Sequence, residues 1–290
     1  MSPKLKAQTS LLLVAIVWGI TFVLVKNALN DAPPFSFATL RFGLATFLTL
    51  GLLNKKILSV SKQELIGGGL CGLFLFMGYA FQNFGLMHTT PSKSAFITSI
   101  SVLIVPLVLV ALGIQKVKLR IWIAVGIATI GLYLLILPGG KGLNVGDALT
   151  FGCSMSFAVH IIAQDSYLKK KVNLLPFFLS QSITVTIISG MHGLVFEPEL
   201  IIWSQRLIHA ILITGVLATF LAFLVMIWAQ KILSAGETAV IFSLEPIFAA
   251  LFSIYMGVEN FGLLKWIGGI VVVLAVIYYS ISNKKSTEQP

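Results

Sequence analysis

The sequence predicts an all-α integral membrane protein with ten transmembrane helices, arranged as two inverted repeats of five helices each. Composition is the first reason: 57% of the 290 residues are hydrophobic and 10% are charged, whereas a soluble domain carries about 25% charged residues. Length is the second reason, because ten spans of about 20 residues use about 200 positions and leave only short connections. An internal similarity between two apolar stretches is the third.

The later of these stretches covers residues 234–257. It is long enough to cross a bilayer as a helix, yet Glu237 lies near its start and Glu245 near its middle. A carboxylate at the bilayer centre costs roughly 2.5–3.5 kcal/mol, so Glu245 must face something other than lipid. Pro246 frees a backbone carbonyl and predicts a kink. A polar group beside a broken helix at mid-membrane is typical of a transport site; a hydrogen-bonded acid that stabilises the kink at Pro246 is the alternative role for Glu245.

Residues 91–111 carry a weaker version of this pattern in the first half of the chain. Pro106 predicts a second kink there, although it falls four positions, about one helical turn, beyond the counterpart of Pro246. We therefore expect two repeat units of about 140 residues, 1–140 and 141–290. A shift of 144 positions pairs Lys93 with Glu237, Ser94 with Thr238, Ala95 with Ala239 and Trp122 with Trp266.

The other apolar runs fill in the remaining helices. In the first repeat they predict helices over residues 9–28, 35–53, a stretch that begins with the glycines at 67–69, and 119–137. In the second repeat they predict helices over 145–167, a polar run around 180–189, 207–229 and 263–281. Small residues at 67–69, and again at Gly215, Ala218 and Ala222, predict close helix packing.

Several polar residues inside the first-half runs are candidates for substrate contact. Trp18 and Lys26 lie on one face of the first helix, with Lys26 at the membrane edge. Arg41 lies two turns into the second helix, where snorkelling to the interface is the alternative explanation. One face near the end of the third helix is polar, and hydrogen bonds between helices are the alternative there; its residues are Tyr79, Gln82 and Asn83.

In the second half, His160 is the only histidine deep inside a span, and it shares a face with Gln164. A hydrogen-bonded structural histidine and a role toward a proton or substrate both remain open. Lys93 and Glu237 begin helices that enter from opposite sides of the membrane, which predicts that Lys93 borders an outer mouth and Glu237 an inner mouth. Lys93 opposes its helix dipole, so we expect a partner or substrate to compensate it; two snorkelling interface charges are the alternative.

Basic residues predict the orientation. With the N-terminus inside and ten alternating spans, the inside segments hold 14 of the 20 Lys and Arg residues. This asymmetry fits the positive-inside rule and places both termini in the cytoplasm of a cell membrane, such as a bacterial inner membrane. The 14 are Lys4, Lys6, Lys55, Lys56, Lys62, Lys116, Lys118, Arg120, Lys169, Lys170, Lys171, Lys231, Lys284 and Lys285.

Motifs along the whole chain resemble the EamA-type members of the drug/metabolite transporter superfamily. They are Trp18-Gly19 with Phe22 and Lys26, the spacing from Pro34 to Arg41, TTPSKSAFITSISVLIVP, FSLEPIFAALFSIYMG and Trp266-Ile267-Gly268. One departure from the family pattern is that Glu259, after the ninth helix, has no acidic counterpart after the fourth helix, where Gln115 and Lys116 stand. The resemblance implies a ten-helix bundle around a central cavity, with the fifth and tenth helices peripheral. It also implies export or exchange of small organic solutes, without identifying the substrate.

We therefore expect a secondary transporter of small solutes such as amino acids or metabolites. No nucleotide-binding P-loop is present to supply ATP energy. A membrane-embedded enzyme is an alternative, but the four histidines show no HExxH spacing and the chain has no GxSxG motif. A non-transporting scaffold is another, although it would not explain Glu245. Flux of solutes into vesicles separates these classes.

The candidate charged groups carry both signs, which favours a zwitterionic solute. We expect this solute and the lipid bilayer as partners, and no nucleic acid, cofactor or metal; Cys71 and Cys153 lie in apolar runs and suggest neither a disulfide nor a zinc site. The expected substrate-binding residues are Trp18, Lys26, Arg41, Tyr79, Gln82, Asn83, Lys93, His160, Gln164, Glu237 and Glu245.

Overall fold

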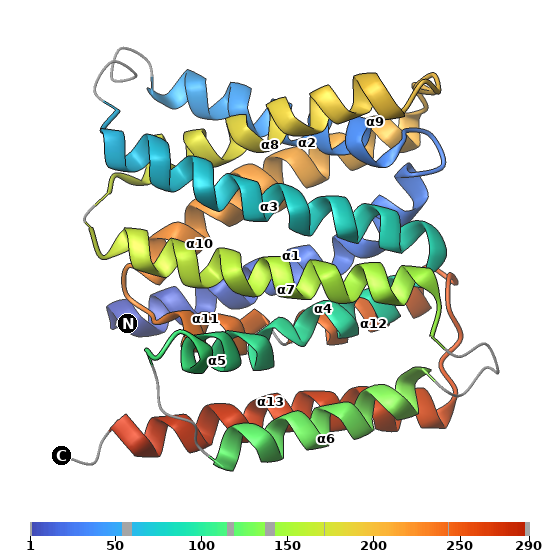
Figure 1. The fold of residues 1–290 in the computed structure, drawn as a ribbon. Helices are drawn as coiled ribbons and strands as arrows, with labels where there is room; N and C mark the ends of the chain where they lie inside the picture. Colours follow the sequence, from blue (N-terminus) through green and yellow to red (C-terminus); the bar gives the residue numbers. More distant parts are fainter. Residues whose placement is uncertain are drawn as a thin grey trace.

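The computed structural model describes residues 2–53, 60–114, 119–136, 143–170, 172–242 and 244–287. Every regular element in these ranges is a helix (Figure 1). The expected repeat boundary at 140 and five of the basic residues used for orientation, Lys55, Lys56, Lys116, Lys118 and Lys171, lie outside the described ranges. The helices are α1 (Pro3–Ala28), α2 (Pro34–Leu53), α3 (Lys62–His88), α4 (Pro91–Ser99), α5 (Ser101–Ala111), α6 (Leu119–Ile136), α7 (Val145–Leu168), α8 (Leu174–Phe196), α9 (Gln205–Leu212), η2 (Ile213–Leu221), α10 (Ala222–Gln230), α11 (Ala235–Phe242), α12 (Glu245–Tyr255) and α13 (Leu263–Thr287).

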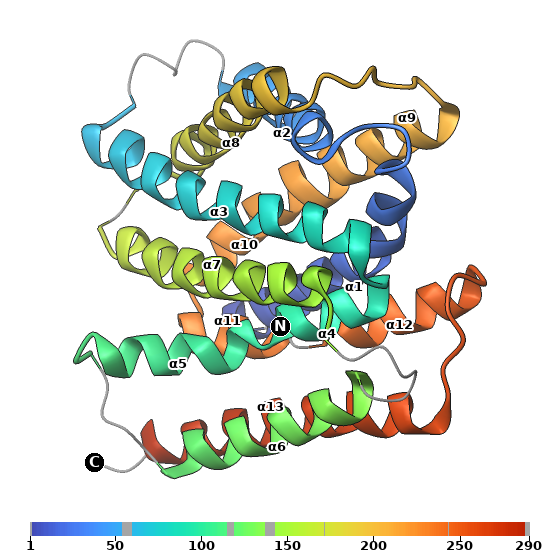
Figure 2. The ribbon, with the colours of Figure 1, turned by 45° about the vertical axis from the view of Figure 1, so that its right-hand side comes forward.

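Eight helical segments in the described ranges are long and apolar enough to cross a membrane. They are α1, α2, α3, α4 with α5, α7, α8, α9 with η2 and α10, and α11 with α12. Helices α6 and α13 occupy the two remaining predicted segments and lie side by side at one edge of the bundle (Figures 1 and 2). The chain is therefore a multi-pass helical membrane protein; the total of ten spans stays a prediction.

The bundle has two recognisable ends. The long helices run roughly parallel across Figure 1, and α1 begins at the same end at which α13 finishes. Helix α3 packs between α7 and α8, while α1 contacts α12, η2, α10 and α11. Helix α1 thus lies among the helices of the second half of the chain.

Two of the spans are broken at positions 144 residues apart. Helix α4 gives way to α5 at Ile100, and α11 gives way to α12 at Leu244. Both broken spans then end at a glycine in the left-handed region, Gly113 with φ 71° and Gly257 with φ 66°. This conformation is accessible to glycine at little cost and ends many helices. The same turn geometry therefore recurs at the offset that the sequence comparison suggested.

The two predicted kinks differ in outcome. Pro246 is the second residue of α12, directly after the break, and its ring excludes a helical bond to the carbonyl of Phe242, where α11 ends. Pro106 instead lies inside α5, six residues beyond the break at Ile100. In the first half, the break is therefore not at the predicted proline. Pro106 removes one bond, to the carbonyl of Val102, and α5 continues around it.

The regular helix expected over residues 207–229 contains a π-helical stretch, η2. Its small residues allow the predicted close packing: a Cβ added to Gly215 would lie 2.8 Å from the Leu44 side chain and 3.2 Å from the carbonyl oxygen of Arg41. Ala218 is fully buried. Wide turns of this kind are frequent at functional sites.

Acidic side chains join helix ends. Glu197, after α8, accepts hydrogen bonds from the backbone of Phe35 (2.7 Å) and Ser36 (2.8 Å) at the start of α2. Glu64, at the start of α3, accepts from the backbone (2.7 Å) and side chain (2.8 Å) of Asn173, which caps α8. Carboxylates are favoured at helix N-termini, where backbone N–H groups have no helical partner.

The connection before α2 is anchored in a similar way. Asp31 accepts two hydrogen bonds from Arg206, at 2.6 and 2.8 Å, and one from Ser204 at 2.7 Å. These hydrogen bonds, led by the one from Arg206, lower the pKa of the Asp31 carboxyl. A lowered pKa means that the contact stabilises the fold above the pKa of the unfolded chain, and that the stabilisation is lost as the pH falls through the lower, folded value.

The contact of α3 with α8 gives a first testable prediction. A Cβ on Gly68 would lie 2.5 Å from the Ser180 Cβ and 2.7 Å from the carbonyl oxygen of Phe177, whereas a Cβ on Gly69 would meet nothing nearer than 3.8 Å. We expect Gly68→Ala to destabilise the protein by about 1–3 kcal/mol through overpacking. The adjacent control, Gly69→Ala, should be neutral or stabilising because alanine favours helix. Thermal unfolding of the purified protein measures both; equal melting temperatures would contradict this packing.

Candidate functional site

A partly open cavity lies within the bundle. Residues from both halves of the chain line it, on α1, α2, α3, α7, α10 and the two broken spans. Of its 19 lining residues, nine are apolar and ten carry a polar or charged group, a mixture that can both bury and orient a small molecule. The polar residues are Trp18, Thr21, Arg41, Tyr79, Gln82, Thr98, Ser99, Ser101, His160 and Glu245.

Arg41 is the cationic group of the cavity and is 3% exposed. Its Nε donates to Thr219 Oγ1 at 2.5 Å, and its Nη2 donates to the Tyr79 hydroxyl at 3.1 Å and to the Ala218 carbonyl at 3.2 Å. The guanidinium carbon lies 4.5 Å from the centre of the Tyr79 ring, within range of a cation–π contact. Nη1 makes no hydrogen bond within the described ranges. It is also not among the side-chain atoms there that are both inaccessible to solvent and without a hydrogen-bond partner. Arg41 is therefore fixed by three partners, with one nitrogen left for a ligand.

Trp18 contacts the same carbonyl from α1. Its Nε1 donates to the Ala218 oxygen at 2.7 Å, and its ring packs against Phe223 and Phe242, at 5.5 and 4.7 Å between centroids. One oxygen of η2 thus accepts hydrogen bonds from α1 and α2 together.

Glu245 is the acidic group of the cavity. It is the first residue of α12, and in the described part of the chain its carboxylate makes no hydrogen bond or ion pair. Its backbone is tightly packed instead: a Cβ on Gly19 would lie 2.7 Å from the Glu245 carbonyl oxygen. Glu245 and Arg41 lie close enough for their charges to interact. The cavity therefore contains a basic and an acidic side chain that are not joined by an ion pair.

The remaining polar wall is neutral. Ser101 is the first residue of α5, the position that corresponds to Glu245 at the 144-residue offset. Among described residues, neither the Ser101 hydroxyl nor the Gln82 amide has a hydrogen-bond partner. Both residues line the cavity. His160 bonds to Gln181 through Nε2 at 2.9 Å. These groups can donate to or accept from a bound solute.

Three other predicted site residues are not part of the cavity wall. The ammonium of Lys26 donates to the backbone carbonyls of Leu86 and Met87, at the C-terminal end of α3, where a cation complements the helix dipole. Asn83 donates to the Pro34 carbonyl at 3.1 Å. Gln164 also lies outside the cavity, in a buried chain of amides described below. The helices that carry these residues were predicted correctly, but their structural partners were not.

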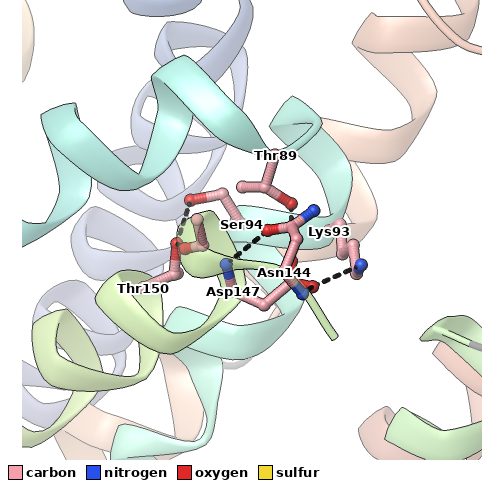
Figure 3. A network of polar contacts seen from close by, with 7 residues as sticks. Thr89, Lys93, Ser94, Asn144, Asp147 and Thr150 are labelled. Carbon is pink, nitrogen blue, oxygen red and sulfur yellow. Dashed lines mark hydrogen bonds and ion pairs between the residues drawn. The ribbon is translucent and has the colours of Figure 1, made fainter. Parts of the chain in front are cut away.

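Lys93 lies in a polar network at the junction of α4 and α7 (Figure 3). Its ammonium pairs with Asp147 at 2.6 Å, and the side chains are 16% and 1% exposed. Asp147 also accepts from Thr89 at 2.7 Å and from the backbone of Asn144 at 3.0 Å, which closes a capping box on α7. The expected compensation of Lys93 is thus supplied by a protein carboxylate.

A second acid holds the same end of α4. Glu259 accepts from the backbone and hydroxyl of Ser92, at 3.0 and 2.7 Å, and from the hydroxyl of Ser253 at 2.5 Å. Glu237, at the opposite end of the bundle, forms a capping box with Ser234 and an ion pair with Lys4 at 2.6 Å. Side chains 54% and 39% exposed make this pair a surface contact, worth about 0–1 kcal/mol.

Several residues that form or support the site were not predicted as site residues from the sequence. Ala218 and Thr219 fix Arg41 from η2, and nothing in the sequence distinguishes η2 from a regular helix. Phe223 and Phe242 line the cavity beside Trp18. Asp147 could have been found, because Asn144 three residues before it forms the signature of a capping box.

The three-partner geometry of Arg41 gives a second prediction. Lysine keeps the charge but cannot reproduce a planar fork, so Arg41→Lys should cost about 1.5–3 kcal/mol, the range for charged hydrogen bonds. The same substitution at Arg206, which also donates two hydrogen bonds but has a 51% exposed side chain, serves as the comparison and should cost less, because water can replace part of the lost contact. Melting temperatures of the two variants give the comparison. Equal losses would mean that Arg41 is not held as described.

Comparison with known proteins agrees with this architecture. The sequence profile of the EamA-like transporter family matches twice, at residues 5–137 and 144–281. An "Uncharacterized transporter" of Archaeoglobus fulgidus is 33% identical over 278 residues, covering 96% of this chain and 87% of the relative. The transporter YoaV of Bacillus subtilis is 22% identical, covering 85% and 87%.

Two further similarities are narrower in scope. A "Probable amino-acid metabolite efflux pump" of Escherichia coli is 36% identical, but over 77 residues, or 26% of this chain and 25% of the relative. A crystal structure with 17% sequence identity superposes with a TM-score of 0.71 and covers 98% of this chain and 99% of its own; this likeness concerns the fold alone. Since the family profile matches nearly the whole chain, this protein belongs to the EamA-like transporter family.

Proposed function

We propose that this protein is a secondary transporter that exports or exchanges small zwitterionic solutes, such as amino acids or metabolites, by alternating access. The observation that carries the proposal is the pair of opposite charges in the cavity. Glu245 has no protein partner in the described ranges, and Nη1 of Arg41 is free of hydrogen bonds there. A carboxylate left unpaired at this depth is costly in the absence of a ligand cation or proton.

The two broken spans suggest that different parts of the cavity bind the two charged groups of the solute. Helices α5 and α12 both begin at the cavity wall, with Ser101 and Glu245. A helix N-terminus carries partial positive charge and favours an anion. At α12 this charge faces Glu245, whereas at α5 it faces only the Ser101 hydroxyl. The α5 end and Arg41 therefore suit the carboxylate of a solute, and Glu245 suits its ammonium group.

Ten spans in two inverted repeats are the architecture that we propose for this transport cycle. The matching breaks and glycine turns at an offset of 144 residues support it. Helices α6 and α13 hold Trp122 and Trp266, which correspond at the same offset. An odd number of spans in each repeat inverts the second relative to the first, so the same element can open toward opposite sides. We place both termini in the cytoplasm of the cell membrane on the basis of the lysine distribution.

In this proposal the starts of α4 and α11 lie at the outer and inner ends. Two buried acids, Asp147 and Glu259, hold the start of α4. The start of α11 is held by the exposed pair of Lys4 and Glu237. Opening to the outside therefore requires the separation of more buried contacts than opening to the inside.

Substitution of Glu245 tests the binding site. Glu245→Gln keeps the size of the side chain and removes the charge, so the KM for amino acids should rise about 10- to 100-fold, the equivalent of a lost charged hydrogen bond. Counterflow in proteoliposomes with each of the twenty protein L-amino acids gives the measurement. Glu199→Gln, in the exposed connection before α9, is the control. Unchanged counterflow in Glu245→Gln would exclude Glu245 from solute binding, and no counterflow by the unsubstituted protein would exclude amino acids as substrates.

Side-specific labelling tests the orientation. Cys71 and Cys153 are buried and free, and both can be replaced by alanine to give a cysteine-free background. In that background, Lys93→Cys should react with an impermeant thiol reagent added outside the cell, and Glu237→Cys with the reagent added inside. Reaction of both cysteines from one side is incompatible with the proposed arrangement.

A further inference from the structure

A buried chain of side chains leads away from the cavity at His160. Nε2 of His160 lies 2.9 Å from Gln181 Oε1, Gln181 Nε2 lies 3.1 Å from Gln164 Oε1, and Gln164 Nε2 bonds to Gln230 Oε1. The exposed fractions run from 0% to 4%. The chain links α7, α8 and α10, and no part of the proposed binding scheme uses it.

In the amide orientations of this structure, the hydrogen bonds place a proton on Nε2 of the imidazole. An amide oxygen only accepts hydrogen bonds, so with Gln181 Oε1 toward the ring, His160 Nε2 carries the hydrogen between them. Each following amide then donates to the next oxygen. In a neutral imidazole with Nε2 protonated, Nδ1 holds a lone pair and is an acceptor. No carboxylate within the described ranges forms an ion pair with the ring that would stabilise a second proton.

The unprotonated nitrogen is available to the cavity. His160 is part of the cavity wall, and Nδ1 has no hydrogen-bond partner in the described part of the chain. The side-chain atoms there that are inaccessible to solvent and lack a hydrogen-bond partner are Asn83 Oδ1, Ser189 Oγ, Gln230 Nε2 and Thr238 Oγ1. Nδ1 of His160 is not among them, so it is accessible from the cavity. The Phe223 ring packs edge-on at 6.1 Å between centroids.

We propose that the chain from Gln181 to Gln230 holds His160 in the tautomer with Nε2 protonated, and that Nδ1 accepts a hydrogen bond from the solute. This inference rests on the proposed function and narrows its substrate class. Besides an ammonium and a carboxylate, the preferred solute carries a further N–H or O–H donor. Selectivity follows because a site with a buried acceptor rejects analogues that leave the acceptor unpaired.

The Gln230 amide, at the far end of this series of side chains, allows a second arrangement of the hydrogen bonds. Gln230 Nε2 is buried without a partner. Reversal of all three amides would leave Gln230 Oε1 unpartnered instead, and would make Nδ1 a donor toward the cavity. The two arrangements predict opposite tautomers of His160.

The tautomer is measured directly by ¹⁵N NMR of histidine-labelled protein in lipid bilayers, with His88, His192 and His209 replaced by glutamine. We expect an unprotonated Nδ1 and a protonated Nε2. Gln181→Leu removes the acceptor for Nε2–H and should give a mixture of tautomers. A protonated Nδ1, or no change in Gln181→Leu, would overturn the assignment.

Counterflow tests recognition by the same nitrogen. L-serine and L-alanine differ by one hydroxyl donor, so the unsubstituted protein should prefer serine. In His160→Phe, which removes the acceptor, the ratio of the KM for alanine to the KM for serine should fall about tenfold, and in the control His209→Phe, an exposed position, it should not change. An unchanged ratio in His160→Phe would refute the acceptor role. If the unsubstituted protein exchanges no amino acid, the proposed function fails, while the NMR measurement still decides the tautomer.

Discussion

The carbonyl oxygen of Ala218 is the contact on which the cavity depends. It accepts hydrogen bonds from Trp18 on α1 and Arg41 on α2, and it belongs to the π-helical stretch η2. Inside a bilayer every backbone group must find a partner within the protein. A wide turn in an apolar helix is therefore tolerated where side chains from neighbouring helices supply that partner. The same two bonds hold an aromatic ring and a guanidinium at the cavity wall, so the irregular backbone also positions the binding groups.

The acidic residues show why position alone does not identify a functional group. Glu64, Asp147, Glu197 and Glu259 all accept hydrogen bonds from helix N-termini. Each joins two parts of the bundle near one of its ends, and each is satisfied by protein donors. Glu245 also begins a helix, but its carboxylate has no such donor among the described residues. An acid that caps a helix contributes to the fold, whereas an acid left without partners at a cavity wall is available to a ligand.

Periodicity and hydropathy predicted most of the fold, and a smaller part of the site. The helix positions and the break before Pro246 follow from runs of apolar residues and from proline chemistry, which are local. Of the eleven candidate residues, six line the cavity: Trp18, Arg41, Tyr79, Gln82, His160 and Glu245. Lys26 and Lys93 could not be assigned from the sequence, because their partners are a backbone carbonyl of α3 and a carboxylate of α7, 54 or more positions away. The π-helical stretch has no signal of its own, since its residues also suit a regular helix.

The two halves of the chain share backbone features but differ in the charge of corresponding residues. The breaks at Ile100 and Leu244 and the turns at Gly113 and Gly257 recur at one offset, yet Ser101 corresponds to Glu245 and Lys93 to Glu237. A strictly symmetric pair of helix N-termini would present two equal positive ends to the cavity and would suit an anion at each. A carboxylate at one of the two changes that end into a site for a cation. In the proposed function, this difference in sequence between two similar backbones is what suits the cavity to a solute with both charges.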